Sequence, residues 1–394
     1  MLNAVTSKFR TLCNTGLFAH RSLISNIFFS FCLSAAANAA DATFLGHNSC
    51  SSSGCHGGAG ANQNQNIVWS RHDPHSHTPA TLATARSATL ARLLGIKDAA
   101  QDRRCTSCHA PWQGVTPKLV PAELKPSVEA VSCETCHGPA SEWIRSHTRP
   151  DLNRAQKGLD GLRDLTILYN RANSCVACHQ AIPPELLQAG HPELTFELDG
   201  QTAAMPRHWR EKDPDIRPKA WLVGQAAALR ELTAQLVTQK ASGSVSTRTF
   251  EQWQALLWVV SKCGSDQELS GISTNAANST NSLRQLHELA DKLALRVSSM
   301  SAGSNIVSTT MLSLVKTSGE FSESKLGAAE LCSRAERLVL ALDRLTLSSS
   351  EQTRLRVDDD LNQLFRLVQN RQTFDRSAFA EHLNKFESAF SRTP

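Results

Sequence analysis

The spacing of apolar residues divides the chain into two unlike parts at about Pro218. Beyond this point apolar side chains recur every three or four residues, which places them on one face of an α-helix. The pattern predicts helices over 221–237, 250–260, 283–297, 331–345, 361–368 and 379–390. Stretches rich in Ser, Asn and Gly at 241–247 and 270–282 are expected to be loops. We therefore expect residues 219–394 to form an all-α helical bundle, a normal size for one domain.

Residues 41–218 lack this regular spacing and are rich in Cys, His, Pro and Gly. Helices are expected only over 80–94, where Gly95 ends the apolar run, and over 164–172. The pairs Asp213-Pro214 and Arg217-Pro218 are typical of a hinge before the bundle. The prediction is a mainly α protein in which an irregular N-terminal domain, with few side chains to fill a core, precedes the bundle.

Four clusters of cysteine and histidine explain how such a domain could be packed. Three have the form Cys-x-x-Cys-His, and the first is a longer version with four residues between its cysteines. In chain order they are Cys50, Cys55 and His56; Cys105, Cys108 and His109; Cys133, Cys136 and His137; and Cys175, Cys178 and His179. In c-type haem attachment two thiols bind the vinyl groups, and the following histidine takes the proximal iron position. The clusters predict four covalently attached haem c groups, whose porphyrins would supply the apolar core.

Other metal sites explain the clusters less well. Four cysteine pairs could build two zinc sites, but the histidine of each cluster would then be a surplus ligand. Iron–sulfur clusters use a different cysteine spacing and do not need that histidine. For the first cluster, a disulfide between Cys50 and Cys55 is the alternative to haem.

The first 39 residues have the features of an export signal. Lys8, Arg10 and Arg21 are their only charged residues, an apolar run covers 23–37, and Ala37-Asn38-Ala39 is a small-residue cleavage pattern. The run is too short and too polar to be a good membrane span. We expect cleavage near Ala39, no stable membrane span in the mature protein, and a periplasmic location.

The charge of the chain argues against nucleic acid as a partner. The net charge is +5, basic and acidic residues are interspersed, and there is no long basic run. This distribution suits a soluble surface that contacts other proteins transiently.

Of the 12 cysteines, only Cys263 and Cys332 lie outside the clusters and the signal, and these two could form a disulfide in an oxidising compartment.

Histidines outside the clusters decide whether each haem is closed. A haem with histidine on both faces serves electron transfer, whereas an open face can bind a small molecule. The N-terminal part has seven such histidines: His47, His72, His75, His77, His147, His191 and His208. By position, we expect His75, His147, His191 and His208 to be the distal ligands. His287 and His382 fall in predicted helices of the bundle and are expected to have surface or packing roles.

Residues 41–215 resemble the multihaem cytochromes of the cytochrome c-554 family. The most specific segment is Cys-Glu-Thr-Cys-His-Gly-Pro at 133–139; others are Asp-Pro-His at 73–75, Ala-Gly-His-Pro-Glu-Leu-Thr-Phe at 189–196 and Met-Pro-Arg-His-Trp at 205–209. The resemblance implies closely packed haems, in parallel or perpendicular pairs, that pass electrons between periplasmic redox partners. It also allows the haem of the second cluster to lack a distal ligand. The longer first cluster and the helical C-terminal half depart from the family pattern.

We therefore expect an electron carrier with other redox proteins as its donor and acceptor. The alternative is an enzyme that converts a nitrogen or sulfur oxide, or hydroxylamine, at one open haem. Related enzymes often mark that haem with Cys-x-x-Cys-Lys or with a cross-linked tyrosine. The chain has no such lysine motif, and its one tyrosine, Tyr169, is expected to serve packing. A third possibility is a structural subunit whose helical domain docks the haem domain into a larger complex.

Overall fold

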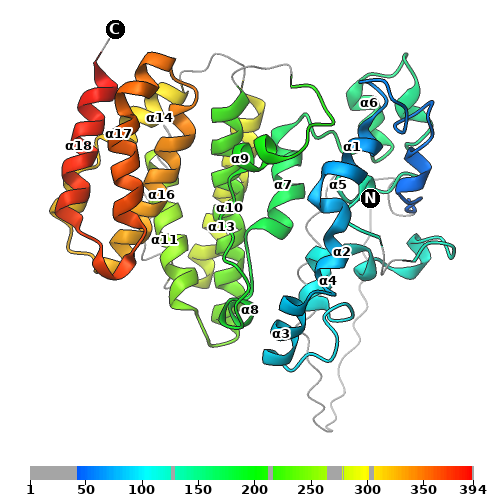
Figure 1. Cartoon of the computed structure of the whole chain (residues 1–394), viewed down its shortest axis with the longest axis horizontal. Helices are drawn as coiled ribbons and strands as arrows, with labels where there is room; N and C mark the ends of the chain where they lie inside the picture. Colours follow the sequence, from blue (N-terminus) through cyan, green and yellow to red (C-terminus); the bar gives the residue numbers. More distant parts are fainter. Residues whose placement is uncertain are drawn as a thin grey trace, which may run out of the picture.

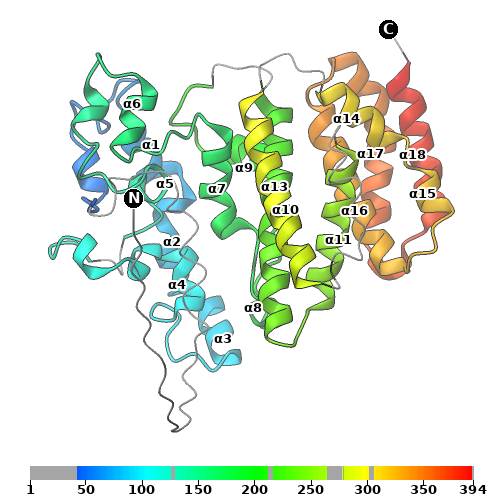
Figure 2. The same cartoon turned by 180° about the vertical axis from the view of Figure 1, so that it is seen from behind.

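Residues 42–125, 129–211, 216–263, 277, 279–300 and 306–392 are described by the computed structural model. The expected signal peptide at 1–39, the Asp213-Pro214 pair and most of the loop expected at 270–282 lie outside these ranges. Within them all regular secondary structure is helical and no residue is in a strand, which confirms the prediction of a mainly α protein. Figures 1 and 2 show the long helices at one end of an elongated molecule and the short helices of the N-terminal part at the other.

The C-terminal part consists mainly of long amphipathic helices. They are α10 (Ile216–Ala241), α11 (Thr247–Lys262), α13 (Thr280–Ser299), α14 (Ile306–Val315), the short α15 (Gly319–Ser322), α16 (Ala328–Thr346), α17 (Glu351–Val368) and α18 (Arg376–Ser391). Each of the six predicted helices lies within one of them. Ser246, Ser279 and Ser350 precede three of these helices and accept a hydrogen bond from the backbone N–H three residues later. These caps fix where the helices begin, at positions earlier than the apolar spacing alone indicates.

The N-terminal part is built from short helices and turns. They are α1 (Gln65–His72), α2 (Thr78–Thr81), α3 (Ala85–Leu93), α4 (Arg103–His109), α5 (Cys133–His137), α6 (Arg154–Leu159), α7 (Leu168–His179), α8 (Pro184–Gln188) and α9 (Leu198–Ala204). The helix predicted over 80–94 is interrupted, because the Thr84 hydroxyl accepts a hydrogen bond from the N–H of Ser87 and starts α3 there. The helix predicted over 164–172 begins at Leu168 and continues through the fourth cluster.

The helices of the bundle are arranged in layers. Helices α10 and α13 pack against each other and against α7, and α10 also packs on α9. On their other side lie α11 and α16, and α17 and α18 form the outermost pair (Figure 1). Because α10 lies between layers, it is buried on most of its circumference, and its small and apolar residues are not confined to one stripe.

One hydrophobic core joins the two parts of the chain. Helix α7 contributes Leu168, Ala172 and Val176 to the buried cluster that fills the bundle, and the segment before α10 contributes Phe196 and Leu198. The Arg217-Pro218 pair, expected in a hinge, lies in the first turn of α10 instead, where proline is tolerated. The fourth cysteine–histidine cluster is therefore carried by a helix of the bundle core.

None of the helices in the described ranges is both long and apolar enough to cross a membrane.

Candidate haem-binding sites

Each Cys-x-x-Cys-His cluster lies on a helix that ends at its histidine. Helices α4, α5 and α7 end at His109, His137 and His179. Residues three apart in a helix lie on the same face, so the two thiols of each cluster are neighbours and the histidine follows them directly. This local geometry presents two thiols and one imidazole together, as covalent haem attachment requires.

The first cluster reaches a related geometry by looping out its additional residues. Cys50 ends a 3-10 turn (His47–Cys50), and residues 51–54 form a bend and turn before Cys55. The backbone N–H of His56 donates to the carbonyl of Cys50 at 3.1 Å and closes this loop. In a helical cluster the equivalent bond runs from the histidine to the first cysteine, four residues earlier. Cys50 and Cys55 are free thiols, so the alternative disulfide is not formed.

Three proximal histidines each face one of the histidines expected as distal ligands. The ring centres are 6.2 Å apart for His56 and His147, 6.5 Å apart for His109 and His191, and 6.0 Å apart for His179 and His75. Metal–imidazole bonds are about 2 Å long, so two imidazoles that share one metal have ring centres roughly 6 Å apart. The spacing of all three pairs fits a single iron between the rings.

The fourth proximal histidine, His137, is coupled electrostatically to His208. Burial lowers the pKa of His137 to about 4, and the charge of His208 is the next cause. Burial also lowers the pKa of His208, whose Nδ1 is buried without a hydrogen-bond partner. Both imidazoles are therefore neutral near pH 7, and the neutral form is the one that binds a metal.

Hydrogen bonds at Nδ1 orient most of these rings. The partners of Nδ1 are Gln65 Oε1 for His56 (2.9 Å), Asp73 Oδ1 for His75 (2.8 Å), Thr81 Oγ1 for His109 (2.8 Å), the Trp143 carbonyl for His147 (3.3 Å) and the Pro192 carbonyl for His191 (2.8 Å). A ring whose Nδ1 is held in this way keeps Nε2 available as a ligand atom. The arrangement suits iron ligation through Nε2.

The other three histidines of this part have different surroundings. The Nδ1 of His47 lies 3.2 Å from a carboxylate oxygen of Glu129, and its ring packs against Trp69. The hydrogen bond to Glu129 raises the pKa of His47, which favours the protonated form that cannot bind a metal. His72 and His77 are exposed.

Cysteines of different clusters approach one another in a definite order. The nearby Cys133 lowers the pKa of the Cys50 thiol, and the nearby Cys178 lowers the pKa of the Cys108 thiol. Burial raises the pKa of Cys175 to about 12, and the neighbouring Cys136 contributes to the increase. The first cluster is therefore next to the third, the third next to the fourth, and the fourth next to the second.

Glu134 joins the first and third clusters, a role that the sequence reasoning missed. Its side chain is 1% exposed, and its carboxylate accepts hydrogen bonds from the backbone N–H groups of Leu45, Gly46 and Ala140 at 2.7–2.9 Å. These bonds attach the segment that leads into the first cluster to the end of α5. The available signal was an acidic residue between the two cysteines of a Cys-x-x-Cys-His motif, where no acid is needed for attachment.

Arg163 joins the third and fourth clusters in a comparable way. Its guanidinium donates to the carbonyls of Thr135 and Cys136, at 3.1 and 2.9 Å, and lies 3.4 Å from the hydroxyl of Ser174 in α7. The last carbonyls of a helix have no partner within the helix, so this arginine completes the end of α5. A single arginine in a loop carries no sequence signal for such a role.

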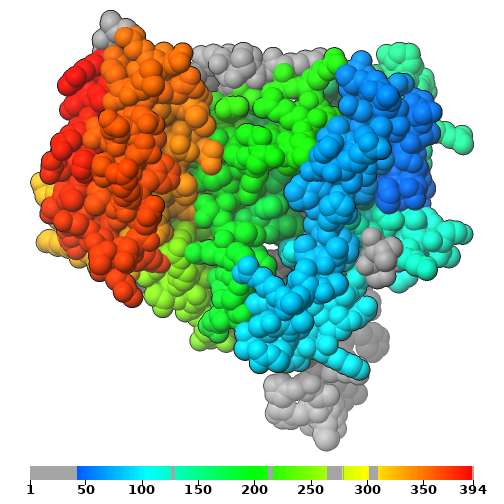
Figure 3. All heavy atoms as spheres, in the orientation of Figure 1, coloured from blue at the N-terminus to red at the C-terminus, as the bar shows by residue number. Residues whose placement is uncertain are grey.

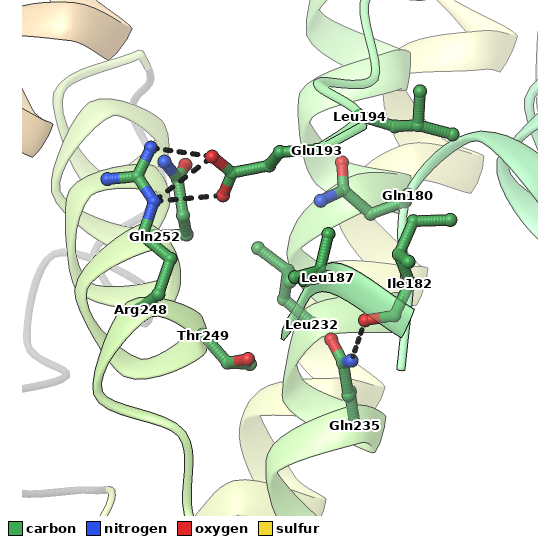
Figure 4. A pocket seen from close by; sticks show the side chains of 10 residues that line it. All are labelled: Gln180, Ile182, Leu187, Glu193, Leu194, Leu232, Gln235, Arg248, Thr249 and Gln252. Atoms are coloured by element: carbon green, nitrogen blue, oxygen red, sulfur yellow. Dashed lines mark hydrogen bonds and ion pairs between the residues drawn. The ribbon is translucent and has the colours of Figure 1, made fainter. Parts of the chain in front are cut away.

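A small polar cavity separates residues 180–194 from α10 and α11 (Figure 4). It is bordered by the ion pair of Arg248 with Glu193, at 2.8 Å, and by the hydrogen bond from Gln235 to the Ile182 carbonyl, at 2.9 Å. Its volume of about 20 Å³ has room for little more than a water molecule, far below that of a substrate pocket. Among the described residues, no three or more His, Cys, Asp or Glu side chains converge as a metal-ion site.

The two cysteines of the bundle are both buried free thiols. Cys263 lies at the end of α11, where its Sγ approaches the Val259 carbonyl at 3.0 Å, and Cys332 lies within α16. They do not form the disulfide that the sequence allowed.

Tyr169 packs at the edge of the bundle core, and its hydroxyl donates to Asp291 of α13 at 2.8 Å, in agreement with the packing role expected for it. His382 lies on the bundle with its Nδ1 3.1 Å from Asp360.

Comparisons with known proteins identify relatives of the N-terminal part. The family described as cytochrome c554 and c-prime matches residues 49–138, a range that includes the first three clusters. The chain is also 27% identical over 178 residues to cytochrome c-554 of Nitrosomonas europaea, an alignment that covers 41% of this chain and 70% of that protein. No solved structure matches this one.

Proposed function

We propose that this chain, a c-type cytochrome of the cytochrome c-554 family, carries electrons between periplasmic redox proteins through four haems that are each closed by two histidines. Membership of the family supplies the covalent haem c and the electron-carrying role. The number of haems, their ligands and the location are our proposals. Bound haem c provides a reversible one-electron Fe(III)/Fe(II) couple, and the protein holds the ligands and excludes other reactions.

The observation that carries the proposal is the pairing of the histidine rings. Ring centres 6.0 to 6.5 Å apart match two imidazoles on one metal, and five of these rings are held through Nδ1. We assign His56 and His147 to the haem of the first cluster, His109 and His191 to that of the second, His137 and His208 to that of the third, and His179 and His75 to that of the fourth. Cys50, Cys55, Cys105, Cys108, Cys133, Cys136, Cys175 and Cys178 are the proposed attachment points.

The haem of the second cluster decides between carrier and enzyme. The family resemblance allows this haem to be open, but His191 lies opposite His109 in this chain. The ring of His191 is held by the Pro192 carbonyl, and α3 packs beside the loop that carries it. A histidine in that position would close the iron to small molecules, which favours electron transfer over catalysis.

The order of the clusters gives the route of the electrons. Since the first cluster is next to the third, the third next to the fourth and the fourth next to the second, the haems of the first and second clusters are at the two ends. Electrons would enter near one of these haems and leave near the other. The proposed ligands are half-buried.

Haem stoichiometry and spin state test this proposal together. Pyridine haemochrome analysis of the purified protein is expected to give four haems per chain, and EPR of the ferric protein is expected to show only low-spin signals. Three haems per chain would mean that the first cluster carries none. A high-spin signal that shifts on addition of nitrite or NO would contradict the closed second haem and support the enzymatic alternative.

A further inference from the structure

Helix α3 forms the outer wall of the second haem site. Its inner residue Ala91 belongs to a small buried cluster against which Cys105 packs, so α3 touches the attachment side of that site. On the other side, Arg86 of α3 donates to the Gly190 carbonyl at 3.0 Å, directly before the distal His191. The helix therefore contacts both the covalent and the distal side of one site.

The side of α3 that faces away from Ala91 is open to solvent. Leu93 is 57% exposed, and Ala85, Ala88 and Arg92 are exposed on the same helix. Figures 1 and 2 show α3 in the lower part of the molecule, beside α8, and Figure 3 shows this region from the same side as Figure 1. Leu93, Ala85 and Ala88 together form a small, weakly apolar surface, and α3 alone separates it from the proposed haem of the second cluster. Transient electron-transfer contacts are at the small end of interface sizes.

Basic residues surround this surface. Residues 83–104 contain five cations, Arg86, Arg92, Lys97, Arg103 and Arg104, and two acids, Asp98 and Asp102. Asp102 is paired with Arg104, and Glu185 of α8 is the further acid whose charge reaches Arg104. Arg92 and Lys97 are exposed and have no ion pair with any residue that the structure describes. The local charge is therefore positive.

The opposite end of the proposed electron route has a different surface. Residues 42–72, which surround the first cluster, contain one cation, Arg71, and no acid, and are rich in Gly, Ser, Asn and Gln. Because like charges repel and complementary potentials steer association, the two ends would select different partners.

We infer that the outer face of α3, with Leu93 at its centre and Arg92 and Lys97 at its rim, docks an acidic electron-transfer protein that exchanges electrons with the haem of the second cluster. This inference rests on the proposed function and adds the class of partner and the place of contact. Opposite charge provides orientation and a fast encounter, while the exposed leucine provides the short-range apolar contact.

The test measures the bimolecular rate of electron transfer from an acidic plant-type [2Fe–2S] ferredoxin, reduced beforehand, by stopped flow. For the unmodified protein the rate is expected to fall as salt is added, because screening weakens complementary charges. The double variant Arg92→Glu/Lys97→Glu is expected to react about tenfold more slowly at low salt. Leu93→Gln is expected to slow the reaction at all salt concentrations.

A matched control separates local from overall charge. Arg284→Glu/Arg354→Glu changes the net charge by the same amount at exposed positions of α13 and α17, in the bundle. It is expected to change the rate by less than about twofold. An equal loss of rate in both double variants, or no loss in the α3 variant, would overturn the inference.

Two further measurements identify other occupants of the surface. A wild-type dimer in sedimentation that Arg92→Glu/Lys97→Glu dissociates, with an unchanged ferredoxin rate, would assign the face to a second copy and overturn the inference. Binding to phosphatidylglycerol vesicles that the same variant loses, again with an unchanged rate, would overturn it in favour of a lipid surface. Haem stoichiometry and EPR of each variant distinguish the proposed function from the proposed docking surface. If the α3 variant keeps four low-spin haems and its rate with ferredoxin is unchanged, only the docking surface is rejected.

Discussion

The difference between an open and a closed haem depends on one side chain, and His191 is the clearest case. Its ring lies 6.5 Å from that of His109, between centres, and its Nδ1 is 2.8 Å from the Pro192 carbonyl. We predict that His191→Ala keeps all covalent haem but converts one of the four proposed haems from low-spin to high-spin, because the proposed ligand His109 would remain alone. EPR and optical spectra of the ferric protein measure this change.

His72→Ala is the matched control, since His72 is an exposed histidine of the same part without a facing imidazole. Its spectra are expected to equal those of the unmodified protein. Unchanged spectra in His191→Ala would remove His191 from the ligand set and reopen the question of small-molecule binding at the second cluster.

Asp73 is placed to tune the proposed haem of the fourth cluster, because its carboxylate holds the proposed ligand His75. The carboxylate is 2% exposed and accepts hydrogen bonds from both the backbone N–H of His75, at 3.0 Å, and its Nδ1, at 2.8 Å. Removing this negative charge weakens the basicity of the ligand and destabilises the ferric state. We predict that Asp73→Asn raises one reduction potential by on the order of 40 mV, roughly 1 kcal/mol for one electron.

Spectroelectrochemical titration resolves this shift, and Asp98→Asn, at an exposed position, provides the comparison. A potential that stays constant or falls in Asp73→Asn would show that the Asp73 carboxylate does not act on the iron through His75.

At the level of single residues, chemistry that repeats locally was predictable and chemistry that depends on folding was not. The spacing of the cysteine–histidine clusters is local, and so is the place of His75 before a helix; their roles in haem binding stay predictions. That His56 faces His147, far along the chain, depends on the turns that bring them together. Glu134 and Arg163 bind backbone groups of distant segments; an acid between two cysteines of a motif was the one local signal for Glu134, and Arg163 had none.

Among the helices, those with one apolar face were predictable from the sequence. Helices whose ends are set by side-chain caps, or that consist only of a cysteine–histidine cluster, were less predictable. The six helices expected in the bundle all occur, because their apolar spacing agrees with the layers they enter. The apolar run at 80–94 is divided by a threonine cap, and α5 is five residues long because it comprises only the third cluster (Cys133–His137). Hydrophobic spacing does not report such short capped segments.

The crossing of α9 and α10 depends on Gly224. A Cβ atom at this position would lie 2.8 Å from Cβ of Leu198, which is fully buried. We predict that Gly224→Ala destabilises the protein by up to about 2 kcal/mol, since overpacking of this kind costs roughly 1–3 kcal/mol and the gain in helix propensity is about 1 kcal/mol. Thermal unfolding followed by circular dichroism measures the effect.

Gly158 of α6 offers the control, because a Cβ atom there would meet nothing within 4 Å. Gly158→Ala is expected to be neutral or slightly stabilising. If both alanine variants unfolded at the same temperature, close packing between α9 and α10 would not be the reason for glycine at 224.

Glu197, just before α9, makes the stability of this junction depend on pH. It is buried, and burial raises the pKa of its carboxyl to about 7 from an ordinary value of 4.5, although the charge of Arg337 opposes the shift. The folded protein therefore binds this proton more tightly than the unfolded chain. The resulting stability is fully present below about pH 4.5 and is lost as the pH rises through 7, a difference of about 3 kcal/mol.

We predict that Glu197→Gln removes most of this loss, so that urea unfolding at pH 5 and pH 8 gives more similar free energies than in the unmodified protein. Gln225 can still donate its hydrogen bond to the side-chain oxygen of the new glutamine. Glu123→Gln, at an exposed acid, should leave the pH dependence as it was. A larger pH dependence in Glu197→Gln would mean that the neighbouring Asp199 dominates the titration.

For the whole molecule, the shared core predicts one cooperative unit. Because α7 contributes to both the fourth cluster and the core of the bundle, neither part can unfold without exposing apolar surface of the other. We predict that the helical signal and the native Soret absorption are lost at the same midpoint temperature in thermal unfolding. Circular dichroism at 222 nm and Soret absorption, recorded on the same sample, would show two separate midpoints if the parts were independent.

Helix α7 also constrains the order in which the protein can be assembled. Its cysteines belong to a cluster that reacts with haem in the proposed function, while Leu168, Ala172 and Val176 are covered by helices that are synthesised later. Once α10 and α13 have packed on this helix, the backbone around Cys175 and Cys178 is fixed. Attachment at the fourth cluster is therefore best completed on a chain whose C-terminal half has not yet folded. A bundle that folded too early would trap a cytochrome with one haem missing, so the slow step in maturation would be set by the part of the chain that binds no haem.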